Sequence, residues 1–323
     1  MFPADFAYAR ARSLDEAFDL LDEAHTAGQE AKLIAGGQSL LPMMKLRLAV
    51  PEVLIDIAGL KELSSSGWYG PSHTIGALTT YRQLGRDRGG VPAITDALAV
   101  LADPQVRARG TIGGAVAHGD PAADLPAVLL ALNATVTVAS RRGKRQVALD
   151  DLLHGIYATD LAEDEIITHI RIDTGGAAAS AYEKFPHPAS HLPLAGVCAV
   201  LRLKDGRIDG VEVAVTGISP RPYRARETER TLVGADPASD SLAAAAAQVT
   251  RLPDGSEATL LGDQHASAPY RAHLAEVLAR RALERALARA RIELSCALNR
   301  GKRPSTTHNL RKPGGMRAHG AHW

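Results

Sequence analysis

The sequence predicts an α+β protein of two domains. The chain has 323 residues, and domains usually have about 100–200 residues, so this length favours two. Hydrophobic residues make up 46% of the chain and charged residues 23%, a balance typical of globular proteins with buried cores. Segments with helical periodicity alternate with short strand-like apolar runs. We therefore expect helices and strands to be mixed within each domain.

Local patterns predict the elements in order. A helix is expected to begin after Ser13, because Ser13 and Glu16 have capping-box spacing, and to end at Gly28. Helix-like patterns follow at 40–48, 91–101, 120–132, 223–233, 239–250 and 268–294. Strand-like runs occupy 31–34, 53–57, 134–139, 145–149, 165–172, 181–185, 195–203 and 210–216. Asp205-Gly206 predicts a hairpin turn between the last two strands.

A glycine- and alanine-rich stretch at 175–180 predicts a linker between the two domains. The predicted division is a first domain at 1–177 with subdomains at about 1–57 and 58–177, a smaller α+β domain at 178–290, and a tail at 291–323. The tail is basic and aperiodic, so disorder is expected. Its histidines, His308, His319 and His322, are too scattered to predict a metal site.

Charge and cysteine content exclude several classes of protein. The chain carries 37 basic and 36 acidic residues, so nothing favours binding to nucleic acid or to a membrane surface. Cys198 and Cys296 alone cannot form an iron–sulfur or metal framework, and Cys198 in its apolar run is expected to be a buried thiol. Neither a signal peptide nor a transmembrane segment is predicted. We expect a cytoplasmic protein in a reducing environment.

A first glycine-containing loop joins a predicted strand to a helix-like run. Its residues are Leu33, Ile34, Ala35, Gly36, Gly37, Gln38, Ser39 and Leu40. Glycine permits positive φ and close backbone approach to a ligand, and N–H groups beside a helix start can bind an anion such as a pyrophosphate. The alternative is an ordinary tight turn, since this is neither a dinucleotide-binding G-x-G-x-x-G nor a P-loop.

A second loop repeats this composition. It contains Gly110, Thr111, Ile112, Gly113, Gly114 and Ala115, preceded by Arg107 and Arg109. A loop with merely solvated arginines is the alternative, but a dinucleotide needs several backbone contacts, and two such loops favour one. Asp120-Pro121 predicts a helix start. Asp124 is expected one turn further, where it either binds cofactor hydroxyls or simply stabilises the helix terminus.

Catalytic motifs are missing from the sequence. It contains no G-x-S-x-G, no H-E-x-x-H and no cysteine cluster. His118 and His187 are the candidates for acid–base work, but no partner lies at a recognisable spacing, and structural roles are favoured. This pattern indicates a protein whose reactive atoms belong to a cofactor.

Several motifs resemble the flavoprotein subunits of molybdenum hydroxylases, particularly the medium subunit of aerobic carbon monoxide dehydrogenase and, more distantly, the flavin domain of xanthine dehydrogenase. The motifs are Ala-Gly-Gly-Gln-Ser-Leu-Leu-Pro-Met-Met-Lys-Leu-Arg-Leu at 35–48, Asp-Pro-Gln-Val-Arg-Ala-Arg-Gly-Thr-Ile-Gly-Gly at 103–114, Asp-Pro-Ala-Ala-Asp-Leu-Pro at 120–126, and the segments 181–190 and 267–283. They occur in order over about 1–290.

The resemblance implies a bipartite FAD-binding fold of the vanillyl-alcohol-oxidase type with a smaller α+β C-terminal domain. It assigns FAD binding to 33–40, to 110–115, to Leu101, and to Asp124, Ile167 and Lys184. No residue is assigned a catalytic or metal-binding role. Ala108 and Ala115 replace residues that are often polar in relatives, and Leu192 lies where relatives often carry an aromatic residue.

The resemblance also implies partners. A large subunit would hold the molybdenum cofactor, and a small subunit would hold two [2Fe–2S] clusters, in a dimer of heterotrimers. This chain would receive electrons from the nearer cluster and pass them through FAD to a quinone, NAD⁺ or another external acceptor, in a complex that is cytoplasmic or attached to the membrane only peripherally. Two alternatives remain: a stand-alone FAD oxidoreductase and an assembly subunit that binds no flavin.

Overall fold

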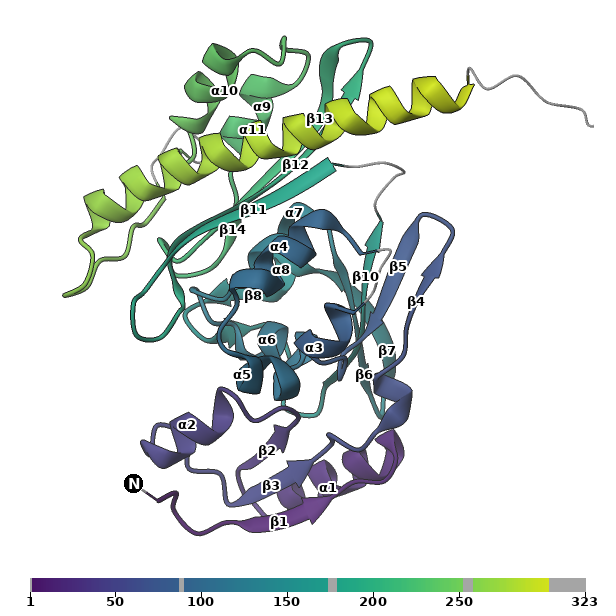
Figure 1. Cartoon of the computed structure of the whole chain (residues 1–323). Coiled ribbons are helices and arrows are strands. Elements are labelled where there is room, and N and C mark those ends of the chain that lie inside the picture. Colours follow the sequence, from purple (N-terminus) through teal and green to yellow (C-terminus); the bar gives the residue numbers. More distant parts are fainter. Residues whose placement is uncertain (1, 87–89, 174–178, 252–257, 302–323) are drawn as a thin grey trace, which may run out of the picture.

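The computed structural model describes residues 2–86, 90–173, 179–251 and 258–301, without side-chain detail for 296–301. Three sheets follow one another from the bottom to the top of Figure 1, and a two-stranded hairpin lies within the central part. Most of the predicted linker, at 174–178, lies outside the described residues, as does the tail from 302 onward with His308, His319 and His322. Helices and strands are mixed in every part of the fold, as the sequence predicts.

The N-terminal lobe is a three-stranded parallel sheet in the order β1-β3-β2, with the helix α1 on it. Its elements are β1 (Ala7–Arg10), α1 (Leu14–Thr26), β2 (Ala31–Ile34), α2 (Leu40–Lys45) and β3 (Val53–Asp56). The predicted cap is present: the Ser13 hydroxyl accepts the N–H of Glu16 at 3.1 Å. The Glu16 carboxylate reaches back to the N–H of Arg12 at 2.7 Å, so both ends of this turn are satisfied.

The central lobe is built on a five-stranded antiparallel sheet in the order β4-β5-β10-β6-β7. Its strands are β4 (Ser66–Tyr69), β5 (Ser72–Gly76), β6 (Thr135–Ser140), β7 (Gly143–Ala148) and β10 (Ile166–Asp173). Its helices are the 3-10 turn η1 (Lys61–Leu63), α3 (Tyr81–Leu84), α4 (Pro92–Val100), α5 (Pro104–Arg109), α6 (Ile112–His118), α7 (Asp124–Ala131) and α8 (Leu149–Leu152). A hairpin of β8 (Leu153–Gly155) and β9 (Ala158–Thr159) completes the lobe.

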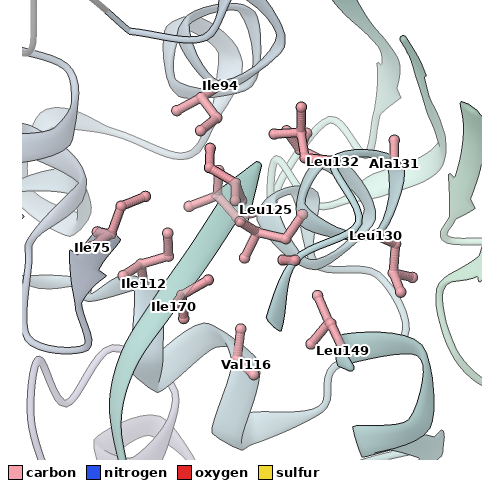
Figure 2. Close-up of a cluster of buried hydrophobic side chains, with 14 of the residues drawn as sticks. Ile75, Ile94, Ile112, Val116, Leu125, Leu130, Ala131, Leu132, Leu149 and Ile170 are labelled. Carbon is pink, nitrogen blue, oxygen red and sulfur yellow. The ribbon is translucent and has the colours of Figure 1, made fainter. Parts of the chain in front are cut away.

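The helix α7 begins later than the sequence suggested. We predicted a start at Asp120-Pro121, but the Asp120 carboxylate accepts the N–H of Ala122 at 2.8 Å and closes a turn instead. Asp124 is therefore the first helical residue, not a residue one turn inside. Every residue of α7 is buried, and Figure 2 shows Leu125, Leu130 and neighbouring side chains filling this core.

The C-terminal part is a four-stranded antiparallel sheet with three helices. Its elements are β11 (Ala179–Pro186), β12 (Pro193–Lys204), β13 (Arg207–Thr216), β14 (Tyr223–Arg224), α9 (Arg226–Leu232), α10 (Ser239–Ala246) and α11 (Ala268–Gly301). Asp205 and Gly206 both have positive φ and form the predicted hairpin turn. The helix α11 extends beyond its predicted end at Leu294 into the segment that we expected to be tail.

Two layers of helices cover the C-terminal sheet. The helix α11 crosses one face, and α4 and α7 pack against the other (Figure 1). Between them, Asp96 of α4 accepts hydrogen bonds from Arg285 and Arg289 of α11 at 2.7–2.9 Å. Although α11 has 34 residues, neither it nor any other helix of the described ranges is apolar enough to cross a bilayer.

Candidate functional site

The two glycine loops meet at one pocket of about 410 Å³ between the N-terminal and central lobes. The first loop connects β2 to α2, and the second follows α5 and continues through Ile112 to Ala115 as the first turn of α6. Most residues that we expected at a cofactor site line this pocket: Leu33, Ile34, Ala35, Gly36, Gly37, Gln38, Ser39, Leu40, Gly110, Thr111, Gly113, Gly114, Ala115 and Ile167. The fold thus brings together segments that are far apart in the sequence.

Two of the glycines let the chain approach itself. A Cβ on Gly36 would clash with the backbone of Arg109, and a Cβ on Gly113 would lie 2.5 Å from the Cβ of Ala77. The N–H of Gly113 donates to the carbonyl of Ala77 at 2.8 Å. We expected these glycines to admit a ligand, but their immediate role is to fit loop against loop.

The first loop offers unused donors to the pocket. Gly37 has φ +71°, which turns the following backbone into the cavity wall. Within the described residues, the N–H groups of Gly37, Gln38, Ser39 and Leu40 donate to no protein acceptor. Successive unpaired N–H groups around a left-handed residue form an anion-binding concavity. This part of the pocket is suited to a phosphate or pyrophosphate.

The second loop forms part of the pocket wall but offers few free N–H donors. The N–H of Ile112 donates to Thr79, that of Gly114 to the Thr111 hydroxyl at 3.2 Å, and that of Ala115 to the Thr111 carbonyl at 3.1 Å. The N–H of Gly113 donates to the carbonyl of Ala77, so every N–H from 112 to 115 has an acceptor within the protein. The expected second N–H cradle is therefore absent from this conformation of the loop, although the exposed Gly114 leaves room for a ligand.

Asp124 and Lys184 lie outside the pocket lining and pair with each other. The Lys184 ammonium lies 2.9 and 3.1 Å from the two Asp124 oxygens, and the Tyr182 hydroxyl donates to Asp124 at 2.8 Å. The side chains of the pair are only 1% and 4% exposed. Burial raises the pKa of Asp124, and the ion pair with Lys184 opposes this shift. This pair joins α7 to β11.

Leu101 and Ile112 are also absent from the pocket lining. Leu101 is 7% exposed and Ile112 is fully buried, and both belong to the central hydrophobic core. Leu101 follows the last residue of α4, and Ile112 begins α6. Ile112 thus anchors the second loop in the core to which Leu101 also belongs.

An aromatic pair lines the pocket, made of His118, which the sequence analysis considered only for acid–base work, and Tyr157, which it did not consider. The rings of His118 and Tyr157 lie 4.9 Å apart between centroids, and both residues face the cavity. Tyr157 has φ +52°, a rare backbone conformation for an aromatic residue that often marks a functional site. Its N–H donates to the carbonyl of Gly119 at 3.0 Å. No periodicity signals such a turn residue in the sequence.

Among the other lining residues that the sequence analysis did not assign are a phenol and a carboxylate. Tyr81 has its pKa raised by burial and, less strongly, by the charge of Asp124. Glu165 accepts two hydrogen bonds from Arg145 at 2.7 and 2.8 Å, and these lower its pKa. The carboxylate is thus ionised and already paired.

The other histidine that we considered lies away from this pocket. His187 packs edge-on against His265, with ring centroids 4.4 Å apart, and its Nδ1 accepts the N–H groups of Ala189 and Ser190 at 3.1 Å. It stabilises a turn between β11 and β12, which agrees with the structural role that we favoured.

These features fit FAD. A dinucleotide requires a donor-rich segment for its pyrophosphate and flat apolar surfaces for its rings. The first loop provides the donors, and Leu33, Ile167 and the Tyr157 ring provide surfaces for the rest. No lining carboxylate other than the paired Glu165 opposes an anion.

Comparison with known families agrees with this chemistry. The family described as the FAD binding domain in molybdopterin dehydrogenase matches residues 4–173. The family described as the CO dehydrogenase flavoprotein C-terminal domain matches residues 180–286. The two matches leave out the last part of α11.

Individual relatives match over nearly their whole length. The glyceraldehyde dehydrogenase medium chain of Sulfolobus acidocaldarius is 35% identical over 88% of this chain and 99% of its own. The carbon monoxide dehydrogenase medium chain of Afipia carboxidovorans is 36% identical over 90% of this chain and 100% of its own. Among solved structures, carbon monoxide dehydrogenase from Hydrogenophaga pseudoflava superposes with a TM-score of 0.83 at 36% identity, covering 90% of this chain and 99% of that one. This likeness confirms the predicted fold class.

Proposed function

The chain belongs to the family of FAD-binding medium subunits of molybdenum hydroxylases, and from that premise we propose that it carries electrons from a partner subunit to an external acceptor. Bound FAD supplies the capacity to take up electrons and pass them on. The protein supplies binding, orientation and shielding. The observation that carries the proposal is the pocket in which the unpaired N–H groups of the first loop face the second loop.

The described residues divide this work. The N–H groups of Gly37 to Leu40 would hold the pyrophosphate, and the rings of His118 and Tyr157 would form one wall. Ile112 would hold the second loop against the core that contains Leu101, and the Asp124–Lys184 pair would fix α7 to β11. We propose that 1–177 form the FAD-binding domain in two subdomains and 178–290 the C-terminal domain, which the family matches at 4–173 and 180–286 support.

We propose that the partners are a large subunit with the molybdenum cofactor and a small subunit with [2Fe–2S] clusters, in a dimer of heterotrimers. Support comes from relatives named as the medium chain or medium subunit of dehydrogenases and hydroxylases. The acceptor would be a quinone, NAD⁺ or another oxidant. A stand-alone oxidoreductase would need its own acid or base at the cofactor, and His118 is the lining histidine available for that role.

The first experiment is the visible spectrum of the natively purified chain, with analysis of released cofactor. We expect flavin bands, release of FAD, and copurification of molybdenum- and iron-containing subunits from the native source. A folded, colourless chain that takes up no added FAD would overturn the proposal in favour of a flavin-free assembly subunit. FAD retained by a chain that turns over substrate without partners would favour the stand-alone enzyme.

A pair of glycine variants tests the donor loop. Gly37→Ala places a side chain at φ +71°, and Gly28→Ala does the same at φ +69° with nothing within 4 Å of the new Cβ. Both variants should lose stability by about 1 kcal/mol from backbone strain. Only Gly37→Ala should weaken FAD binding, by about tenfold, because it displaces the donors. Equal FAD affinities in the two variants would remove the loop from the proposed site.

A further inference from the structure

A second groove adjoins the pocket on the far side of Tyr81. It encloses about 640 Å³ between α3, α4 and α5, and Tyr81 lines both cavities. The tyrosine is placed by the bond from its N–H to the carbonyl of Gly110 at 3.0 Å, and its ring packs on Gly110. A ligand in this groove would therefore lie next to the second glycine loop.

Three arginines converge on the groove. Arg82 lies on α3, Arg86 follows it one turn later, and Arg107 lies on α5. No carboxylate is among the lining residues, and within the described parts of the chain neither Arg82 nor Arg86 has an ion-pair partner. Elsewhere most described arginines are paired, as Arg142, Arg145 and Arg202 are. Among the described residues, the groove thus keeps an unbalanced positive charge.

Arg107 is held in place before any ligand arrives. Its Nη1 donates to the carbonyls of Leu101 and Ala102, both at 2.7 Å, and its other nitrogens have no protein acceptor within the described residues. A guanidinium fork whose remaining donors are free and whose position is fixed suits a phosphate, because little side-chain entropy is lost on binding.

The rest of the groove is apolar. Leu98 and Ala99 of α4, Pro104 of α5 and the Tyr81 ring form its walls. Gly85 and Thr95 complete the lining. Arginines beside apolar and aromatic walls match a ligand that carries both phosphate and a flat organic part.

We infer that this groove is a second binding site, for a phosphate-bearing organic anion of the nucleotide class. It goes beyond the proposed function, because apart from Tyr81 none of its residues lines the FAD pocket.

The test is calorimetric titration of the full chain with ADP, after the FAD pocket has been filled and excess FAD removed, so that ADP cannot enter that pocket and no free FAD competes for the groove. The variant Arg82→Gln/Arg86→Gln removes two groove charges, and the control Arg12→Gln/Arg281→Gln removes two exposed arginines elsewhere whose guanidinium groups have no ion-pair partner among the described residues. We expect ADP to bind the wild type and the control alike, at least tenfold more weakly to the groove variant, and more weakly as salt is raised. Thermal melting checks that both variants are folded.

Two results would overturn the inference. If the wild type shows no saturable ADP binding, or if the wild type and the groove variant bind ADP equally tightly, then these arginines form no site. If inorganic pyrophosphate binds as tightly as ADP, the apolar walls add nothing to the affinity. The inferred ligand would then be a phosphate or pyrophosphate without an organic part. Because FAD content is measured separately by absorbance, these results do not depend on the fate of the proposed function.

Discussion

Replacing Gly36 by alanine tests how the two glycine loops are held together. In the structure a Cβ at Gly36 would lie 2.8 Å from the carbonyl carbon of Arg109 and 3.0 Å from the Cα of Gly110, and closer still to the Arg109 oxygen. Ordinary Cβ contacts begin at 3.4 Å, so the carbonyl carbon must move by 3.4 − 2.8 = 0.6 Å and the oxygen by more. All of these atoms are backbone, and no side-chain rotation relieves the clash.

Overpacking of this kind costs about 1–3 kcal/mol. Because the displaced loop is one wall of the pocket, we expect the Kd for FAD to rise by about 10- to 100-fold. The assay is fluorescence titration of the apoprotein with FAD, alongside a thermal melt. Gly262→Ala is the matched control, since its Cβ would lie 2.7 Å from the backbone nitrogen of Ala268, far along the chain from both loops. It should lower the Tm and leave FAD affinity unchanged. Wild-type FAD affinity in Gly36→Ala would refute this account of the loops.

Three further predictions concern charges. Asp124→Asn leaves the Lys184 ammonium buried without a counter-charge, and should cost about 3–5 kcal/mol of unfolding free energy by denaturant titration; a loss below 1 kcal/mol would mean that water reaches the pair. Asp96→Asn removes the acceptor of Arg289 and Arg285, and should cost about 2 kcal/mol, measurable as a lower Tm that salt brings closer to wild type. Burial lowers the pKa of His118 below 6.5, so the unfolded state binds more protons and stability should fall as pH drops through 6.5; in His118→Asn the Tm should decline less with acid, and an identical pH profile would contradict this.

Prediction from sequence succeeded where a residue's role depends on near neighbours. The cap at Ser13 and the turn at Asp205-Gly206 are local events, and both were confirmed. The first loop was also found in the right place, because a strand, two glycines and a helix-like run are adjacent in the chain. Cys198 is fully buried, as its apolar surroundings indicated.

The failures concern contacts that form only in the folded chain. Asp120 could cap a helix by its sequence, but its carboxylate closes a turn on Ala122 and the helix starts later. The residues next to Gly36 in the sequence do not indicate that Gly36 will pack against the backbone of Arg109. Likewise Tyr157 lies in a two-residue turn between short strands, and only the packing of that hairpin against α6 brings its ring to the pocket.

The burial of α7 has a consequence for the synthesis of the protein. Every residue of this helix is covered, and much of that cover comes from β12 and β13, while the Thr216 hydroxyl ties the sheet to the carbonyl of Pro121 at 2.8 Å. The ribosome makes α7 long before β13. Residues up to 173 therefore emerge with an apolar helix face that has no cover until Thr216 has left the exit tunnel. Transiently exposed apolar surface of this kind is prone to aggregation, so we expect that interval to be the stage of synthesis at which the chain is most exposed to misassembly.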